Sequence, residues 1–551
     1  MNYYLSVIII LAVAGVATLS GSHLRLELQE KTRQRLLWAM TLVFFVVYAA
    51  LGTYKLEAMQ MGNWDFGIYD SLLRNAANGR GLMRDYRGMF DHFSPIILIF
   101  APLYRIWDSQ LWLVLIQSSA LAFAAPLLYA TARHYFKRSS FPLLLTAMYL
   151  FNPYYSRLAL YDFHAECLFP LFFFGAFYFY SQKRMIPFFI LLALSPLIKE
   201  DFVIPVGAIG LWLLTQRGKR CWGVGAIALA ILYVFFVLKV YYPHILKVNY
   251  WHYNRYVLFA PTFTETMRNA GVMFAKLFNA TTFPVVISVL LPFALLPLFN
   301  WKSFLFLWLP VIGIQLVSDN LHQRLLLSHY SSALIAVTPV AALCGARSLR
   351  ASKLRIWQFC NSRKFLEIAF KFRRAAFAGA TVTMLCCHIA YCDLPISRYM
   401  DYIEKLPPYQ GGIISLPLRP IYWQEMARRL RHANKVKAIF EQLPVTPQST
   451  MICQNEPGVY FLPKARVFDF PEIGFGNVRP DRADFFVMDR GNYCGDGVDL
   501  SEVNDLIQTL AKDPTYKVIS HPNGVLVFYR PGVPVLQLPD RTLKPADTNK
   551  N

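Results

Sequence analysis

The chain has 551 residues, of which 56% are hydrophobic and only 16% carry a charge. Soluble domains carry about 25% charged residues, so the composition excludes an ordinary soluble protein and indicates a polytopic membrane protein. The net charge of +22 does not indicate nucleic-acid binding, because the lysines and arginines lie in short loops between apolar runs. That distribution is the positive-inside pattern of membrane proteins.

The apolar runs predict about twelve membrane-spanning helices. Residues 3–20 follow no basic residue, so they predict a retained first helix with its N-terminus outside. The basic segment from His23 to Arg35 is then cytoplasmic, and residues 36–53 cross back outward. We expect the later spans, which alternate in direction, at residues 111–133, 141–155, 167–181, 185–198, 202–216, 223–242, 283–299, 303–318, 330–347 and 375–392.

The most basic loop fixes the orientation. It runs from Arg347 to Arg374 and holds nine basic residues against one acid. Such loops stay on the cytoplasmic side. The sequence therefore predicts a multi-pass protein of the cytoplasmic (inner) membrane, with both termini extracytoplasmic. The first large outer loop, residues 54–110, contains an apolar piece from Ser94 to Ile106 that is too short to span and suits a re-entrant segment.

The composition changes after residue 392, and the chain divides there. We expect a transmembrane domain over residues 1–392, a small extracytoplasmic α/β domain over 393–540 and a flexible tail over 541–551. Cys453 and Cys494 lie in the second domain, where an oxidising compartment would let them pair; whether they do is open. Its predicted helix is Trp423–Phe440, and its predicted strands are Ser449–Cys453, Phe485–Met488 and Gly524–Phe528.

Ionisable residues gather at span ends on the outer side. Charged groups near membrane depth are costly, so they mark a site by default, the alternative being a solvated rim. The predicted set comprises Asp65, Asp70, Asp91, His92, Arg157, Asp162, His164, Glu166, Lys199, Glu200, Asp201, Arg324 and His329.

Asp65 and Asp70 differ in their neighbours. On a helix over residues 64–78 they lie about 140° apart, so both cannot face one cavity. Asp70 has Arg74 four residues on, which predicts an ion pair on the helix surface. Asp65 has no basic residue three or four positions later, so it is the better candidate for a free carboxylate. The alternative role for Asp65 is an N-terminal helix cap.

Three other groups carry chemistry. Asp91-His92 predicts a second wall of the site or, alternatively, a loop bend. Asp162, His164 and Glu166 offer three ligand-type side chains in five residues, which leaves open a divalent-cation site for Mg²⁺, Mn²⁺ or Ca²⁺. In Lys199-Glu200-Asp201 the lysine would hold a phosphate, or it would form a self-neutralising pair with the neighbouring glutamate.

Five short segments match a known family. They are Asp65-Phe-Gly-Ile-Tyr-Asp70, Asn78-Gly-Arg-Gly81, Asp91-His-Phe-Ser-Pro95, Tyr161-Asp-Phe-His164 and Lys199-Glu-Asp201. They resemble an uncharacterised family of bacterial and archaeal polytopic membrane proteins, which is similar to the GT-C glycosyltransferase superfamily of protein O-mannosyltransferases and the aminoarabinose transferase of lipid A. The superfamily places its acidic loop after the first helix, whereas here the loop follows the second, so residues 3–20 are an added helix.

The resemblance implies a GT-C-like fold and an inverting transfer outside the cytoplasmic membrane. The donor would be a polyprenyl-phosphate-linked sugar, and the acceptor a lipid, a glycan or a protein. Asp65 matches the catalytic acid of the superfamily and would act as the base. The substrate-binding candidates are Asp91, His92, Arg157, Asp162, His164, Lys199, Glu200, Arg324 and His329.

Two other classes stay open from the sequence. A lipid or solute transporter, or a flippase, would show charges deep inside the spans and an internal repeat. A non-catalytic envelope assembly protein would work through its outer domain and would not need Asp65.

Overall fold

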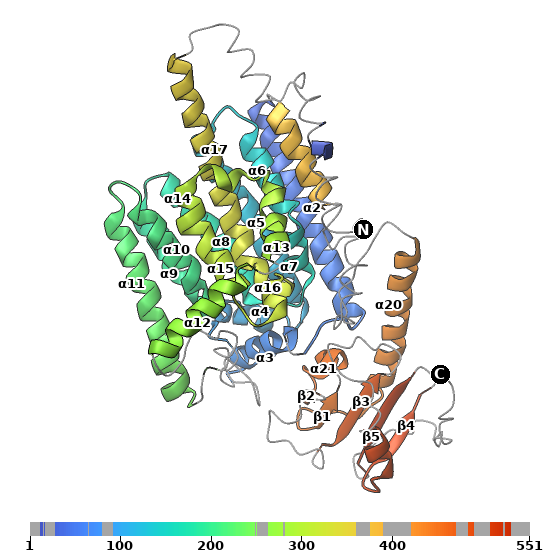
Figure 1. The fold of residues 1–551 in the computed structure, drawn as a ribbon. Coiled ribbons are helices and arrows are strands. Elements are labelled where there is room, and N and C mark those ends of the chain that lie inside the picture. Colours follow the sequence, from blue (N-terminus) through green and yellow to red (C-terminus); the bar gives the residue numbers. More distant parts are fainter. Residues whose placement is uncertain are drawn as a thin grey trace.

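The computed structural model describes residues 12–14, 16, 28–63, 65–79, 92–247, 250, 263–278, 282–359, 375–388, 420–453, 455–469, 483–489, 507–521 and 524–530. Figure 1 shows a bundle of helices and, beyond one end of it, a small sheet with helix α20 beside it. The predicted first helix, residues 3–20, lies almost entirely outside the described residues.

Four helical stretches are long and apolar enough to cross a membrane, within the described ranges. They are Glu30–Glu57, Leu111–Tyr135, Arg220–Ile245 and Leu321–Ser352. Each exceeds the roughly 20 residues that a bilayer requires. Shorter apolar helices, of 10–17 residues, are Pro95–Ile106, Phe141–Leu150, Ala165–Ser181, Met185–Leu197, Thr282–Phe293, Trp301–Leu316 and Ala375–His388. The multi-pass helical architecture agrees with the sequence, while the count of about twelve spans stays a prediction.

Prolines break several of the predicted spans. The expected span 141–155 is two helices, α6 (Phe141–Leu150) and α7 (Pro153–Leu160). Proline lacks the N–H that a continuing helix needs, so it begins a new helix instead. The Asn152 side chain caps α7 by accepting a hydrogen bond from the Tyr154 amide at 2.9 Å. The expectation of one continuous helix over residues 141–155 is therefore wrong, because the chain forms two helices there.

The remaining helical elements follow the chain in order. They are α2 (Glu30–Glu57), α3 (Phe66–Ala77), η3 (Pro95–Phe100), α4 (Ala101–Ile106), α5 (Leu111–Tyr135), η4 (Ala165–Leu168), α8 (Phe169–Ser181), α9 (Met185–Leu194), η5 (Ser195–Leu197), η6 (Glu200–Phe202), α10 (Val203–Leu214), α11 (Arg220–Phe236), η7 (Val237–Ile245), α12 (Phe263–Lys276), α13 (Thr282–Leu290), η9 (Leu291–Phe293), η10 (Leu296–Phe299), α14 (Trp301–Ser303), η11 (Phe304–Trp308), α15 (Leu309–Leu316), α16 (Leu321–Arg324), η12 (Ser328–Ser331) and α17 (Ser332–Phe359).

Helix α5 lies at the centre of the bundle and packs against α2, α6 and α8. Its neighbours supply a buried aromatic core in which Tyr149 packs edge-on against Tyr155 and Phe174. Elsewhere glycine allows close approach: a Cβ at Gly345 of α17 would lie 1.8 Å from the Leu296 carbonyl oxygen. These contacts hold the loops at the end of the bundle in fixed positions.

The C-terminal part is a small mixed sheet. Strand order is β2-β1-β3-β5-β4, with β1 parallel to β2 and β3, and β5 antiparallel to β3 and β4. The sequence located α20 and three of these strands correctly; the limits 393–540 and the extracytoplasmic side stay predictions. The strands are β1 (Thr450–Cys453), β2 (Arg466–Asp469), β3 (Phe485–Asp489), β4 (Lys517–Ser520) and β5 (Val525–Tyr529), and the helices are α20 (Pro420–Phe440) and α21 (Asn455–Phe461). Because Cys494 lies outside the described residues, its pairing with Cys453 also stays a prediction.

The sheet unit contacts the end of the bundle that carries the Asp65 loop. The Lys437 ammonium lies 2.6 Å from the Glu57 carboxylate at the end of α2. The buried Met59, just after α2, packs in the same apolar cluster as Phe440 and Phe461. The unit therefore covers part of the loop that the sequence singled out.

Candidate functional site

Asp65 stands at the N-cap position of α3 but makes no side-chain capping hydrogen bond. Its Oδ2 accepts a hydrogen bond from the Tyr161 hydroxyl at 2.7 Å, and its Oδ1 lies 3.4 Å from His164 Nε2. The side chain keeps 32% of its surface exposed. The expectation of a free carboxylate is thus wrong, because a distant segment supplies the partners that the local sequence lacks. The carboxylate nevertheless remains accessible.

Asp162 fixes the start of the Asp65 loop. Its carboxylate accepts a hydrogen bond from the Gly62 amide at 2.6 Å and one from the Lys55 ammonium at 3.1 Å. Burial raises the pKa of Asp162, and the nearby Lys55 opposes that rise. Asp162 therefore joins the end of α2 to the 161–164 segment and sets the position of Asp65 relative to His164.

His164 is the cation beside Asp65. Its backbone is extended, and Nδ1 lies 3.0 Å from the Asp162 carbonyl oxygen. Burial by itself would lower the pKa of His164, but the negative charges of Asp65 and Glu166 outweigh it and raise the pKa to about 9. His164 is therefore protonated at neutral pH, and it places a positive charge next to the Asp65 carboxylate.

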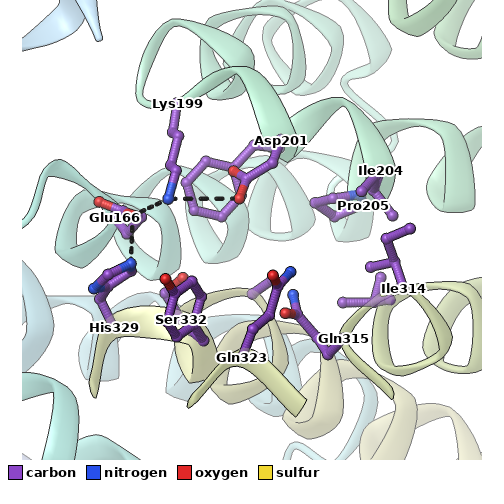
Figure 2. A pocket seen from close by; sticks show the side chains of 14 residues that line it. Glu166, Lys199, Asp201, Ile204, Pro205, Ile314, Gln315, Gln323, His329 and Ser332 are labelled. Atoms are coloured by element: carbon purple, nitrogen blue, oxygen red, sulfur yellow. Dashed lines mark hydrogen bonds and ion pairs between the residues drawn. The ribbon is translucent and has the colours of Figure 1, made fainter. Parts of the chain in front are cut away.

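A second histidine continues the cluster on the other side of His164. The His329 ring stacks on the His164 ring with centroids 3.8 Å apart. His329 Nε2 lies 3.7 Å from Glu166 Oε1, which also receives the Lys199 ammonium at 2.6 Å. Lys199 is in turn 3.6 Å from Asp201, as Figure 2 shows. Six of the predicted residues thus meet in one chain of contacts: Asp65, His164, His329, Glu166, Lys199 and Asp201.

Lys199 does form a neutralising pair, but with Glu166 of the preceding loop rather than with its neighbour Glu200. Glu200 instead faces His92, whose Nδ1 lies 2.7 Å from Oε1, and Tyr250, whose hydroxyl donates at 2.8 Å. Burial by itself would raise the pKa of Glu200, but His92 and Lys199 lower it to about 2. His92 and Glu200 therefore form a separate hydrogen-bonded pair beside the chain that starts at Asp65.

The proposed metal ligands point to different partners. Asp162 faces Lys55, His164 faces Asp65, and Glu166 faces Lys199. Over the ranges that the structure describes, no group of three or more His, Cys, Asp or Glu side chains is arranged to hold a metal ion. The geometry gives the divalent-cation alternative no support.

The two predicted arginines lie on different elements. The Arg157 guanidinium of α7 lies 5.3 Å from the centre of the Tyr154 ring. Arg324 ends α16, the short helix just before His329. Asp91, the predicted second wall, lies outside the described residues.

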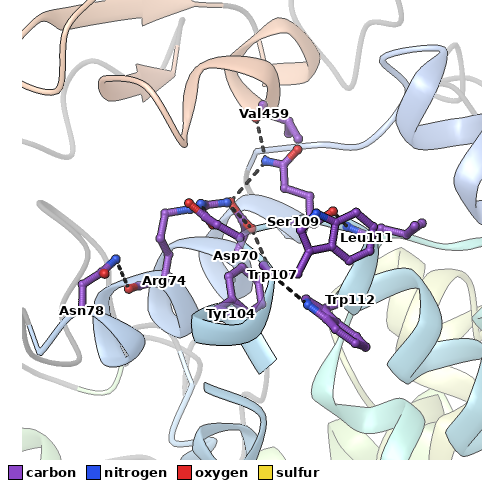
Figure 3. A network of polar contacts seen from close by, with 11 residues as sticks. Asp70, Arg74, Asn78, Tyr104, Trp107, Ser109, Leu111, Trp112 and Val459 are labelled. Carbon is purple, nitrogen blue, oxygen red and sulfur yellow. Dashed lines mark hydrogen bonds and ion pairs between the residues drawn. The ribbon is translucent and has the colours of Figure 1, made fainter. Parts of the chain in front are cut away.

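Asp70 belongs to a different network, shown in Figure 3. It is fully buried and receives hydrogen bonds from Arg74 at 3.2 Å, from the Tyr104 hydroxyl at 2.8 Å and from Gln110 at 3.2 Å. Gln110 also donates to the Val459 carbonyl of α21 at 2.8 Å. The predicted Asp70–Arg74 pair forms, but it is buried rather than on the surface, because α4 and the sheet unit cover it.

Sequence reasoning missed two polar residues of this region. Lys55, near the end of α2, holds Asp162, and Gln315, in the apolar helix α15, lines the pocket beside Lys199. A polar residue inside an apolar run is the signal that would have found Gln315, and a basic residue just after the end of a predicted span is the signal for Lys55.

Comparisons with known proteins identify the family of this chain. Residues 55–379 match the family model described as "Predicted membrane protein (DUF2079)". Two solved structures are similar, both of ArnT from Cupriavidus metallidurans: one bound to undecaprenyl phosphate (TM-score 0.47) and one in the apo state (TM-score 0.46). Each is 12% identical to this chain, and each match covers 88% of this chain and 97% of the ArnT chain. No curated protein sequence matches this chain.

Proposed function

This chain belongs to the DUF2079 family of predicted membrane proteins, and from there we propose that it is a membrane glycosyltransferase. It moves a sugar from a polyprenyl-phosphate donor to an acceptor hydroxyl at the outer face of the cytoplasmic membrane. The class of donor follows from the motif resemblance to the GT-C superfamily. The observation that carries the proposal is the accessible Asp65 carboxylate, which Tyr161 and His164 hold at the end of the helical bundle.

The chemistry assigned to Asp65 is proton removal. As the acceptor oxygen forms its bond to the anomeric carbon, the bond from that carbon to the phosphate oxygen breaks and its electrons stay on the phosphate. The acceptor proton passes to Asp65, provided that the hydroxyl lies within hydrogen-bond reach. Attack opposite the leaving phosphate inverts the anomeric centre.

Tyr161 and His164 position the base. The Tyr161 hydroxyl orients one carboxylate oxygen, and the positive His164 lies beside the other. An ionised carboxylate is the natural partner of this cation, and it is the form that accepts a proton.

Negative charge develops on the leaving phosphate, so nearby cations would stabilise it. Arg157, Arg324 and His329 are the proposed groups. Lys199 fits this role poorly, because its charge is shared between Glu166 and Asp201.

A transporter or flippase is the second candidate. The observation that favours it is the buried Glu166–Lys199 pair, whose side chains are 2% and 3% exposed, since transporters place ionisable groups inside their helical bundles. A transporter would move its substrate without transferring a sugar.

Sugar transfer by membranes containing the protein tests the proposal. The donors are a panel of polyprenyl-phosphate sugars, and the variants are Asp65→Asn and, as a matched control, Asp319→Asn, an exposed carboxylate that pairs with Lys276. Loss of a general base lowers the rate about 10²- to 10⁴-fold, so Asp65→Asn should lose transfer at unchanged expression while the control retains it. Equal transfer by wild type and Asp65→Asn would place the base elsewhere. No transfer by the wild type from any donor would contradict the proposal.

A further inference from the structure

The end of the helical bundle away from the sheet is strongly basic (Figure 1). It includes the end of α5 with the turn after it (residues 132–140), the end of α8 with its turn (180–186) and the part of α17 beside them (345–352). These three segments hold seven lysines and arginines and no aspartate or glutamate. Glu30, at the start of α2, lies 2.6 Å from Arg33 and 3.1 Å from Arg133, so it can neutralise one of these charges at most.

Aromatic rings of α5 hold the arginines of α17 in place. The Arg347 guanidinium lies 3.8 Å from the centre of the Tyr135 ring. Arg350 donates a hydrogen bond to the Tyr135 carbonyl oxygen at 3.0 Å, and its guanidinium lies 5.4 Å from the centre of the Phe136 ring. A guanidinium that stacks on a ring keeps its charge in a fixed position. Both arginines are nevertheless exposed, so a ligand can reach them.

The turn after α8 places a third cation in a defined position. Lys183 adopts a left-handed backbone conformation with a φ of 61°. Two backbone hydrogen bonds close the turn, from the Lys183 amide to the Tyr180 carbonyl at 3.0 Å and from the Arg184 amide to the Phe179 carbonyl at 2.9 Å. The exposed Lys183 side chain therefore starts from a fixed backbone.

Three cations from three different segments lie around one ring. Lys137, Lys183 and Arg347 are each close enough to His134, in the last turn of α5, to act electrostatically on its ring. We call these three residues the basic cluster. Their charges repel one another, and the positive potential that they create favours an anion between them.

The surface next to the cluster is apolar. Ile186 and Ile190 follow Lys183 on α9, four residues apart and so on one face of the helix, and they are 68% and 53% exposed. A ligand that covers both surfaces carries a negative group at one end and hydrocarbon at the other. Phospholipids have this structure, and basic clusters at the ends of membrane helices attract the anionic ones.

We propose that the basic cluster binds the headgroup of an anionic phospholipid. Its phosphate lies among Lys137, Lys183 and Arg347, and an acyl chain runs along the two isoleucines of α9. A zwitterionic phospholipid binds more weakly, because its ammonium group cancels the phosphate charge and is repelled by the cluster. The site lies at the other end of the bundle from Asp65 and does not depend on the proposed transferase function.

Native mass spectrometry of the full-length protein in detergent tests this site. The probes are phosphatidylglycerol, phosphatidylcholine of the same chain length and, separately, inorganic phosphate. The variants are Lys183→Gln, Arg347→Gln and their double variant, with Lys464→Gln as the control, an exposed lysine of the sheet unit that also lies against a tyrosine ring. Each cluster variant should weaken the binding of the first phosphatidylglycerol about fivefold and the double variant about 25-fold. The control should bind phosphatidylglycerol like the wild type.

Phosphatidylcholine binding should be weaker in the wild type and unchanged in every variant, which also shows that the variants are folded. Equal affinity of the wild type for the two lipids, or wild-type phosphatidylglycerol affinity in the double variant, would overturn the proposal. Inorganic phosphate that displaces the lipid at equal concentration would identify a soluble anion as the ligand and would overturn it as well.

Discussion

The imidazole rings of His164 and His329 stack with their centroids 3.8 Å apart and their planes inclined by 18°. One ring faces Asp65 and the other faces Glu166, so each histidine has a carboxylate on its outer side. The stack is a contact between two rings, whereas the contacts of Lys199 with Glu166 and Asp201 join opposite charges. It connects the proposed base to the buried Glu166–Lys199 pair through two residues that come from distant parts of the sequence.

The raised pKa of His164 predicts a pH-dependent contribution to stability. Because the folded pKa of about 9 exceeds the ordinary value of 6.5, the stabilisation is fully present below pH 6.5 and is lost as the pH rises through 9. The shift from 6.5 to about 9 corresponds to roughly 3 kcal/mol. We expect the stability difference between wild type and His164→Phe, which keeps an aromatic ring in the stack, to shrink between pH 6 and pH 10.

Thermal unfolding in detergent across this range measures the difference. His244→Phe, at an exposed histidine of η7, is the control and should follow the wild-type curve. A constant difference between wild type and His164→Phe at all pH values would show that His164 is not charged in the folded protein.

The Glu166–Lys199 pair predicts strong coupling between two buried residues. Removing one partner leaves an uncompensated buried charge, which typically costs about 3–5 kcal/mol. We therefore expect Lys199→Met to destabilise the protein by that amount and the double variant Glu166→Gln/Lys199→Met to recover most of the loss. A double-mutant cycle of unfolding midpoints measures the coupling. Additive effects of the two changes would contradict the pair.

Asp65 and Asp70 should separate activity from stability. Asp70 is buried and receives hydrogen bonds from Arg74, Tyr104 and Gln110, so Asp70→Asn should destabilise the protein by about 2–4 kcal/mol. Asp65 is partly exposed, so Asp65→Asn should lower the unfolding midpoint less than Asp70→Asn does while abolishing transfer. Unfolding midpoints and transfer per folded molecule, measured on both variants, test this. A large loss of stability in Asp65→Asn alone would make Asp65 a structural residue.

Close packing of α17 predicts a position that tolerates no side chain. A methyl group at Gly345 would lie 1.8 Å from the Leu296 carbonyl oxygen, which is a backbone atom and cannot rotate away. We expect Gly345→Ala to destabilise the bundle by at least about 3 kcal/mol. Gly313→Ala in α15 is the matched control: no atom lies within 4 Å of its added Cβ among the described residues, so it should be neutral or stabilising by up to about 1 kcal/mol. Similar unfolding midpoints for both variants would contradict the close approach.

Much of the architecture can be predicted from the sequence. Apolar runs and basic loops identify a multi-pass helical membrane protein, because a backbone can cross the hydrocarbon core of a bilayer only when its N–H and C=O groups hydrogen-bond to each other, as they do in a helix. Local signals also place α20 and the strands β1, β3 and β5 within a few residues. The motifs pointed to the family that the match over residues 55–379 confirms. Prolines such as Pro153 are also visible in the sequence. Because apolar residues continue on both sides of them, the sequence does not show that one helix ends there and another begins.

The partners of the charged residues depend on tertiary structure. Asp65 has no local cation, yet folding brings Tyr161 and His164 to it. Lys199 has Glu200 beside it in the sequence but pairs with Glu166 of another loop. Side-chain pairing depends on which span ends meet in space. Hydropathy shows where each span lies in the sequence, but it does not show which spans pack against one another. The sequence by itself therefore determined the class of protein and the ionisable residues, while only the packing of the helices decided which of them form one site.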